Sequence, residues 1–276
     1  MYPQLFELGP FTLRTLSVMM VLAFFITAFL FWRKGREEHY PEIELIDGFL
    51  MAVLIGFVFG RAGYIVAEIG IFGFSVLKWL DVFGYPGLNG AMGTIAATIY
   101  LFRHAKKQKW DPFEILDFWA LALAGGLSIG YLGLFFDGSV FGLQTDLPMG
   151  ITFPGLQEPH HPTALYFSIF FLALSWYLSW VEYRYRTFEW YRAGKKTAQT
   201  GFLISIFLIV SAIFFFAMTW LKPPIFSFFD VNADRLLTLV AIFFGLGLLW
   251  NRSGRNFRPR RKPPTSLTIE DQHVAS

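Results

Sequence analysis

The sequence predicts an all-α integral membrane protein with seven transmembrane helices, its N-terminus outside and its C-terminus in the cytoplasm. Three observations lead to this fold class. Apolar residues make up 55% of the chain and aromatic residues 20%, a composition unlike that of ordinary globular domains. Apolar runs of about 20 residues recur, the length that a helix needs to cross a hydrocarbon core roughly 30 Å thick. Basic residues, finally, gather in alternate connections between these runs.

The seven predicted spans follow the apolar runs in chain order. They cover residues 16–32, 48–66, 88–102, 118–136, 165–180, 202–220 and 236–250. Several of them end in Trp, a residue that anchors helices at the membrane–water interface. The third span is the weakest, because Gly87, Gly90 and Gly93 thin its apolar face and its core is short. A tilted or partly interfacial helix is the alternative for this segment.

The positions of the basic residues predict the orientation of the spans. All but five of the 23 Lys and Arg residues lie in the connections after the first, third and fifth spans or in the C-terminal tail. The exceptions are Arg14, Arg61, Lys78, Lys222 and Arg235. Cytoplasmic connections hold an excess of Lys and Arg, so the bias predicts an odd number of spans and a cytoplasmic C-terminus. Basic clusters beside a membrane face anionic lipid headgroups, and no nucleic-acid partner is expected.

The chain is expected to form one membrane domain, residues 1–250, followed by a basic, disordered cytoplasmic tail at 251–276. Two connections on the outer side, residues 67–86 and 137–162, have room for more than a turn. The second contains no Lys or Arg and is punctuated by Gly and Pro, and loops of that length are usually functional or disordered. The chain has no cysteine, which excludes a thiolate nucleophile and a Cys-ligated metal. Neither a cofactor nor a metal is expected.

Arg61 is the most unusual charged residue of the predicted spans. It stands in the string GFVFGRAGYIVAE, and a charge inside a span costs about 2.5–3.5 kcal/mol on insertion scales. The flanking Gly60 and Gly63 would let another helix or a headgroup approach the guanidinium. The alternative is an arginine near the helix end that extends its side chain to the interface.

Polar residues at the ends of the spans all fall on the predicted outer side. This set comprises Arg14, Arg61, Tyr64, Asn89, Tyr131, Asp137, His160, His161, Tyr166, Asp234 and Arg235. Arginine binds phosphate through paired hydrogen bonds, so a pocket formed by these side chains would suit the headgroup of an anionic phospholipid. Two alternatives stay open. Polar residues gather at any membrane interface, and His161 precedes Pro162, a residue type favoured at the start of a helix.

Four strings in the chain match a known family of membrane enzymes. They are LGPFTLR at residues 8–14, GRAGY at 60–64, GYLGLFFDGSVFG at 130–142 and HHPTALY at 160–166. Their order on seven predicted spans resembles the prolipoprotein diacylglyceryl transferases, over most of residues 8–250. The resemblance implies transfer of the diacylglyceryl group of phosphatidylglycerol to the cysteine thiol of a prolipoprotein signal peptide, at the outer leaflet of the bacterial inner membrane. The nucleophile would belong to the substrate, in agreement with a chain that has no cysteine.

The resemblance also implies roles for individual residues. Arg61 would hold the phosphate of the lipid, supplemented by Arg235. His161, with His160 beside it, is the candidate base that helps to form the thiolate. The other expected contacts with the substrate are Arg14, Tyr64, Asn89, Asp137 and Tyr166.

The chain departs from the family's motifs at several positions. Where the fourth-span motif has an arginine, two asparagines and a glutamate, this sequence has Tyr131, Leu134, Asp137 and Ser139. Phe167 replaces an acidic residue, and Leu88 or Asn89 stands in place of a histidine. Each lost ligand or base can cost a few kcal/mol of transition-state stabilisation. Three functions therefore stay open: a divergent transferase, a noncatalytic relative that binds anionic phospholipid or lipoprotein, and, ranked last, a membrane transporter.

Overall fold

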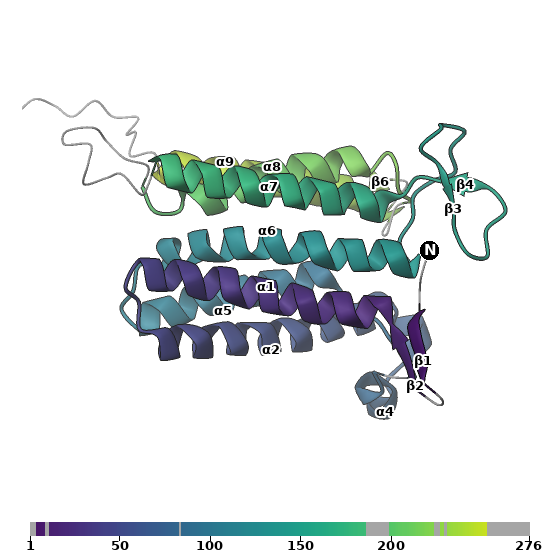
Figure 1. The fold of residues 1–276 in the computed structure, drawn as a ribbon, viewed down its shortest axis with the longest axis horizontal. Helices are drawn as coiled ribbons and strands as arrows, with labels where there is room; N and C mark the ends of the chain where they lie inside the picture. The colour runs from purple at the N-terminus through teal and green to yellow at the C-terminus, as the bar shows by residue number, and fades with distance from the viewer. Residues whose placement is uncertain are drawn as a thin grey trace, which may run out of the picture.

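The computed structural model describes residues 4–8, 11–82, 84–185, 199–223, 227–228 and 231–252. The long helices in this part of the chain are α1 (Thr15–Glu37), α2 (Glu42–Ala67), α5 (Gly90–Lys107), α6 (Pro112–Asp137), α7 (Thr163–Tyr185), α8 (Phe202–Met218) and α9 (Ala233–Arg252). They lie side by side with their axes roughly aligned (Figure 1). Each overlaps one of the predicted spans.

Five helices in the described residues, α1, α2, α6, α7 and α9, are long and apolar enough to cross a membrane. Helix α8 is apolar but has only 17 residues. Helix α5 carries basic residues in its last turn and is not among the helices that meet the length and composition requirement. The chain is therefore a mostly helical, multi-pass membrane protein, as the sequence predicted.

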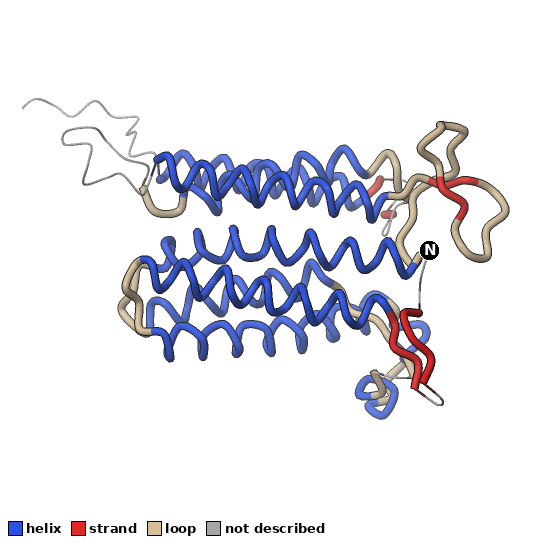
Figure 2. The backbone as a smooth tube through the Cα atoms, in the orientation of Figure 1, coloured by secondary structure: helices blue, strands red, loops and turns tan. Residues whose placement is uncertain are grey.

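The structure adds short elements that the sequence did not predict. Three antiparallel strand pairs occur in the described residues: β1 (Gln4–Leu8) with β2 (Phe11–Arg14), β3 (Ile151–Thr152) with β4 (Pro159–His160), and β5 (Ser227–Phe228) with β6 (Val231–Asn232). All three lie at the same end of the bundle (Figure 2). The predicted connection 67–86 contains two short helices, α3 (Ile69–Phe72) and α4 (Val76–Leu80), at that end. Of the predicted tail, Asn251 and Arg252 belong to α9, and 253–276 lie outside the described residues.

Helix α6 is the centre of the bundle and packs against α1, α5, α7 and α8. Small residues on α6 let its neighbours come close. A methyl group on Gly133 would lie 2.6 Å from Met19 Cβ of α1. On the side of α7, Ser168 Oγ donates to the carbonyl of Ser128 at 2.8 Å. The buried core therefore runs along α6, whereas α9 exposes most of its apolar surface.

Helices α2 and α5 form a close pair through glycine. A methyl group on Gly93 of α5 would lie 2.7 Å from Gly56 O and 3.5 Å from Gly60 Cα, both on α2. Backbone-to-backbone contact of this kind is a common way for membrane helices to associate, because small residues allow more van der Waals contact. Gly93, one of the glycines that weakened the third predicted span, is thus part of its packing surface.

Asp117 of α6 caps helix α8 from inside the bundle. Its carboxylate is buried, with Oδ2 accepting from Gly201 N at 2.8 Å and Oδ1 from Ile204 N at 2.9 Å. Gly201 has φ +92°, a left-handed conformation that glycine adopts without strain. The cap satisfies amide groups that a helix start leaves unpaired.

Removal of this cap is expected to destabilise the protein. Asp117→Ala should lower the free energy of unfolding by about 2 kcal/mol, because two buried N–H groups lose their acceptor. Asp117→Asn keeps one acceptor oxygen and should retain part of the stability. Unfolding in mixed micelles, followed by far-ultraviolet circular dichroism, measures both. Equal stability of Asp117→Ala and the unmodified chain would contradict the capping role.

Candidate functional site

Arg61 lies about two turns before the end of α2 and is only 6% exposed. Its guanidinium donates five hydrogen bonds to backbone carbonyls: Nε to Trp79 (3.1 Å), Nη1 to Tyr85 (2.6 Å) and Gly87 (3.2 Å), and Nη2 to Lys78 (3.4 Å) and Asp81 (3.0 Å). A guanidinium has five N–H donors. The charge therefore organises the connection between α2 and α5, and a phosphate would have to displace at least one of these carbonyls.

Tyr64 and Asn89 belong to the same arrangement, which we name the α2–α5 junction and define as Arg61, Tyr64 and residues 72–82 and 84–89. The Tyr64 ring packs edge-on against Phe72, with centroids 5.8 Å apart. Asn89 caps α5 by accepting from Met92 N at 3.0 Å, and its own N–H donates to Gly60 O at 2.9 Å. Three residues predicted to bind a lipid headgroup thus contact the chain itself.

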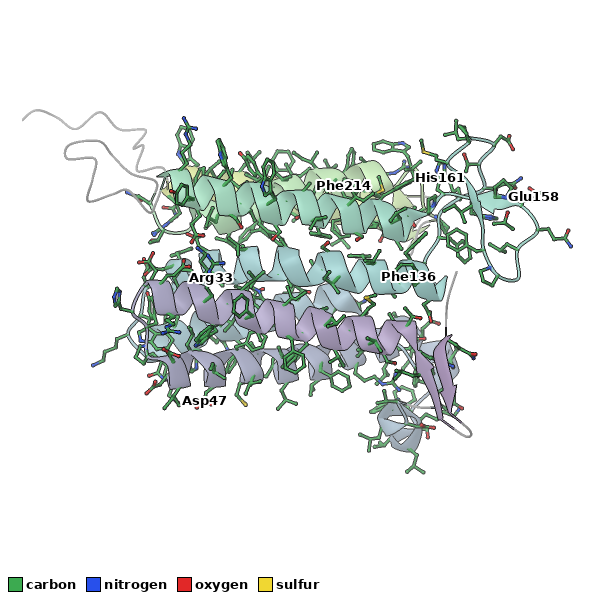
Figure 3. The ribbon with its side chains drawn as sticks, viewed as in Figure 1. Arg33, Asp47, Phe136, Glu158, His161 and Phe214 are labelled. Atoms are coloured by element: carbon green, nitrogen blue, oxygen red, sulfur yellow. The ribbon has the colours of Figure 1, made fainter. Side chains whose placement is uncertain are left out.

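His161 lies where the connection 137–162 meets α7, at the same end of the bundle as Phe136 (Figure 3). It is buried, and its Nδ1 lies 3.4 Å from the hydroxyl oxygen of Tyr166. Its backbone pairs with the connection, because Gly142 N donates to His161 O at 2.8 Å and His161 N donates to Leu143 O at 3.0 Å. The imidazole is thus held close to a hydroxyl group.

His160 has a different environment from its neighbour. It belongs to β4, where its Nδ1 lies 2.9 Å from Glu158 O. Its ring packs edge-on against Phe141, with centroids 5.4 Å apart. The two adjacent histidines therefore have separate contacts, and only His161 is buried.

Lys222 follows α8 and lies over α7. Its Nζ is 4.4 Å from the centroid of the Phe167 ring, and Phe167 in turn stacks on Tyr131 of α6 with centroids 4.7 Å apart. Burial lowers the pKa of Lys222 to about 8, and the nearby charge of Asp234 opposes this effect only in part. A half-buried ammonium group on an aromatic stack is thus placed at the end of α6, α7 and α8.

The remaining predicted residues lie at helix ends. Arg235, in the first turn of α9, donates from Nε to Thr219 Oγ1 at 3.3 Å, and its guanidinium carbon lies 5.1 Å from the centre of the Trp220 ring. Asp137 is the last residue of α6 and is partly exposed. Arg14 is exposed and directly precedes α1.

Most of the predicted site residues therefore separate into two groups of contacts, and Arg14, Asp137 and His160 belong to neither. Arg61, Tyr64 and Asn89 contribute to the α2–α5 junction. A second group surrounds the starts of α7 and α9 and the end of α8, and we name it the α7–α9 cluster: His161, Tyr166, Phe167, Lys222, Asp234 and Arg235. Tyr131 supports it from α6 through its ring contact with Phe167.

The sequence prediction did not include Lys222 among the site residues. One feature of the sequence could have identified it: Lys222 is one of five basic residues outside the predicted cytoplasmic segments. It lies just after the sixth predicted span, and no role was predicted for it from the sequence. Its contact with Phe167, in a different helix, is a property of the folded chain.

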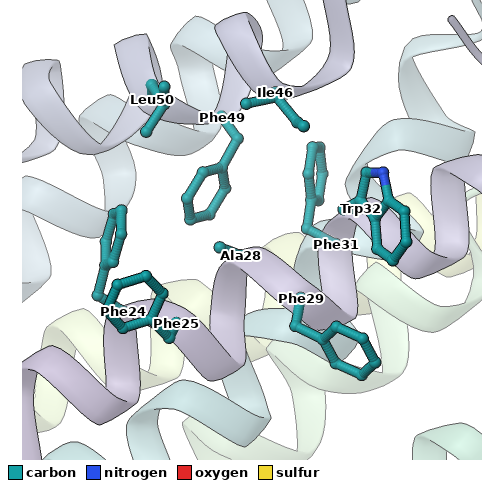
Figure 4. A pocket seen from close by; sticks show the side chains of 9 residues that line it. All are labelled: Phe24, Phe25, Ala28, Phe29, Phe31, Trp32, Ile46, Phe49 and Leu50. Carbon is teal, nitrogen blue, oxygen red and sulfur yellow. The ribbon is translucent and has the colours of Figure 1, made fainter. Parts of the chain in front are cut away.

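An apolar pocket of about 310 Å³ opens between α1 and α2 (Figure 4). Its lining is Phe24, Phe25, Ala28, Phe29, Phe31, Trp32, Ile46, Phe49 and Leu50. None of these side chains is titratable, and none is a predicted site residue. The pocket supplies an apolar surface on the bundle but no group for acid–base chemistry or for phosphate binding.

Comparison with known proteins agrees with the motifs in the sequence. The model of the prolipoprotein diacylglyceryl transferase family matches residues 3–251. Three similar proteins are named phosphatidylglycerol–prolipoprotein diacylglyceryl transferase. The one from Aliivibrio fischeri is 27% identical over 96% of this chain and 95% of its own length, and that from Aeromonas salmonicida is 28% identical over 90% and 89%. The one from Clostridium tetani is 24% identical over 89% and 96%.

These matches cover the described helices from α1 to α9 and both groups of contacts. The aligned lengths are nearly the full lengths of the relatives, so the similarity concerns the whole membrane domain and not one motif. The chain belongs to the prolipoprotein diacylglyceryl transferase family.

Proposed function

We propose that this chain transfers the diacylglyceryl group of phosphatidylglycerol to the lipobox cysteine of a prolipoprotein, at the outer leaflet of the bacterial inner membrane. The names of its relatives support this activity. The observation that carries the proposal within this chain is the α7–α9 cluster, in which a buried imidazole and two cationic side chains occur at one end of the bundle.

The proposed topology is seven spans with the N-terminus outside and the C-terminus in the cytoplasm. A helix at each of the seven predicted positions supports it, together with the bias of Lys and Arg toward alternate connections. Helix α8 has 17 residues and is about 26 Å long at 1.5 Å per residue, slightly less than the hydrocarbon core. A short span of this kind is accommodated by local thinning of the bilayer.

The reaction requires a base, an electrophilic carbon and a stabilised leaving group. His161 would accept the proton of the substrate thiol. The thiolate sulfur would then form a bond to the glycerol carbon, and the bond between this carbon and the phosphate oxygen would break. The electron pair would remain on the departing glycerol phosphate, whose negative charge Arg235 would stabilise. Tyr166, 3.4 Å from His161 Nδ1, would help to orient the imidazole.

A noncatalytic, lipid-binding relative is the second candidate, favoured by one observation. Tyr131 and Phe167 occupy positions at which the family's motifs have charged residues, and here they form an aromatic stack. This stack lacks the guanidinium and the carboxylate that the family's motifs place at these two positions. Such a protein would retain phosphatidylglycerol without modifying a peptide.

A transfer assay separates the two candidates. Purified protein in nanodiscs containing phosphatidylglycerol is incubated with a lipobox peptide, and the peptide mass is followed. An increase equal to one diacylglyceryl group supports the transferase. Retained lipid without a modified peptide supports the noncatalytic binder and contradicts the transferase.

His161→Gln should lower the transfer rate about 100-fold, within the range that general-base catalysis supplies. Retention of phosphatidylglycerol should not change, because the imidazole acts on the thiol. His104→Gln is the matched control. His104 lies in the last turn of α5, where its Nε2 contacts Glu44 O, and it belongs to neither group of contacts. An unchanged transfer rate in His161→Gln would remove His161 as the base.

A further inference from the structure

The backbone around Lys222 is fixed by the connection 137–162. Leu143 N donates to Leu221 O at 2.8 Å, which ties the connection to the residue just before Lys222. Gly142 makes this approach possible, because a methyl group on it would lie 2.3 Å from Leu221 O. Lys222 therefore has a defined position relative to the start of α7.

The side chain of Lys222 rests on a buried aromatic stack. Phe167 is 1% exposed, packs in parallel with Tyr131 on one side and contacts Phe215 of α8 at a centroid distance of 4.9 Å. A cation over the face of an aromatic ring is attracted by the ring quadrupole. This contact positions the ammonium group but satisfies none of its N–H donors with an acceptor oxygen.

In the described part of the chain, no carboxylate lies in direct contact with the ammonium group. An ammonium has three N–H donors, and within the described residues no hydrogen bond or ion pair of Lys222 to an oxygen is found. Asp234 of α9 acts on it only as a nearby charge. Burial explains why the pKa of Lys222 falls to about 8, and the charge of Asp234 opposes this effect. An anionic ligand would supply the missing acceptors.

We propose that Lys222 binds the phosphate of an anionic glycerophospholipid, with the acyl chains directed along the apolar surface of α7 and α8. This assignment rests on the proposed function and adds to it a phosphate ligand from the end of α8. A lipid is favoured over free phosphate because the ammonium rests on a buried aromatic stack, a few residues after the end of the apolar helix α8. Phe167 acts in positioning, since its ring supports the cation and is itself stacked on Tyr131.

Binding of a phosphate by Lys222 is expected to depend on pH. Protonated Lys222 attracts phosphate, and the neutral amine does not, so retention should decrease as the pH rises through about 8. The other titratable or charged groups at this end of α6, α7 and α9 are Tyr131, Asp137, His161, Tyr166, Asp234 and Arg235. Asp234 favours the protonated amine.

The test measures retention of phosphatidylglycerol by purified protein in nanodiscs at pH 7 and pH 9.5. Lys222→Met should weaken retention at pH 7 at least about tenfold, since one charge-assisted contact is lost. The unmodified chain should show a similar decrease between pH 7 and pH 9.5. Lys222→Arg should retain lipid at both values, because a guanidinium stays charged. Lys107→Met, at an exposed lysine in the last turn of α5 and outside both groups of contacts, is the matched control and should resemble the unmodified chain.

Each outcome decides a separate claim. Retention by Lys222→Met equal to that of the unmodified chain at pH 7 would overturn the assignment. If Lys222→Met is unstable, the comparison of the unmodified chain with Lys222→Arg at the two pH values decides, and parallel pH profiles would overturn it. Equal protection against thermal unfolding by inorganic phosphate and by phosphatidylglycerol would overturn the lipid source. Lys222→Met could lose lipid retention while the unmodified chain fails to modify the peptide. That result would contradict the proposed transferase function but not the assignment of Lys222.

Discussion

Arg61→Met is expected to release the connection between α2 and α5 and to lower the free energy of unfolding by about 3–5 kcal/mol, because buried carbonyl groups lose a charged donor. The buried guanidinium satisfies the carbonyls of residues 78, 79, 81, 85 and 87. Met fills similar space without supplying a donor. Arg61→Lys should recover only part of the stability, since an ammonium has three donors.

Two measurements check this prediction. Unfolding in mixed micelles gives the change in stability, and limited proteolysis reports whether residues 73–87 become accessible. Arg14→Met is the control, because Arg14 is an exposed arginine at the start of α1. If Arg61→Met leaves stability and proteolysis unchanged but abolishes lipid retention, Arg61 binds the headgroup, as the sequence predicted.

Lys34→Met is expected to cost a similar amount, about 3–5 kcal/mol, because it leaves a buried carboxylate without its partner. Lys34 Nζ of α1 lies 2.7 Å from Glu182 Oε2 of α7, and the side chains of these residues are 16% and 6% exposed. The pair joins two helices that both pack on α6. Glu182→Met should cost less, because Lys34 keeps Glu37 at 2.7 Å.

The double variant Lys34→Met/Glu182→Met completes the comparison. It removes both charges, so its stability should return to near that of the unmodified chain, in keeping with the high desolvation cost of buried ion pairs. Unfolding free energies of the four proteins form a double-mutant cycle. Strictly additive losses in the double variant would show that the two side chains are not coupled.

The helical framework was predictable because long apolar runs have few alternatives in a membrane. A segment in hydrocarbon must satisfy its own backbone hydrogen bonds, which favours a helix. The strand pair formed by Ile151–Thr152 and Pro159–His160 was not predictable in this way. Two-residue strands carry little periodic signal, and their pairing depends on where the connection is anchored, as at Leu143 and Leu221.

The candidate site was predictable as a set of residue types but not as a set of contacts. Sequence reasoning identified Arg61 as a costly charge, and the structure gives it carbonyl partners from the following connection. Those partners could not be foreseen, because backbone carbonyls have no signature in the sequence. Lys222 was overlooked for the related reason that its aromatic partner, Phe167, lies in another helix.

The glycine contact between α2 and α5 bears on how the chain enters the membrane during synthesis. Helix α5 ends in Lys106 and Lys107, and by composition it would be a poor substrate for independent insertion. Gly93 can dock against Gly56 and Gly60 only after α2 is in place, and α2 emerges first from the ribosome. We expect α5 to be inserted as the second arm of a helical hairpin, so that a bulky side chain at Gly93 would disturb biogenesis before any effect on catalysis could be measured.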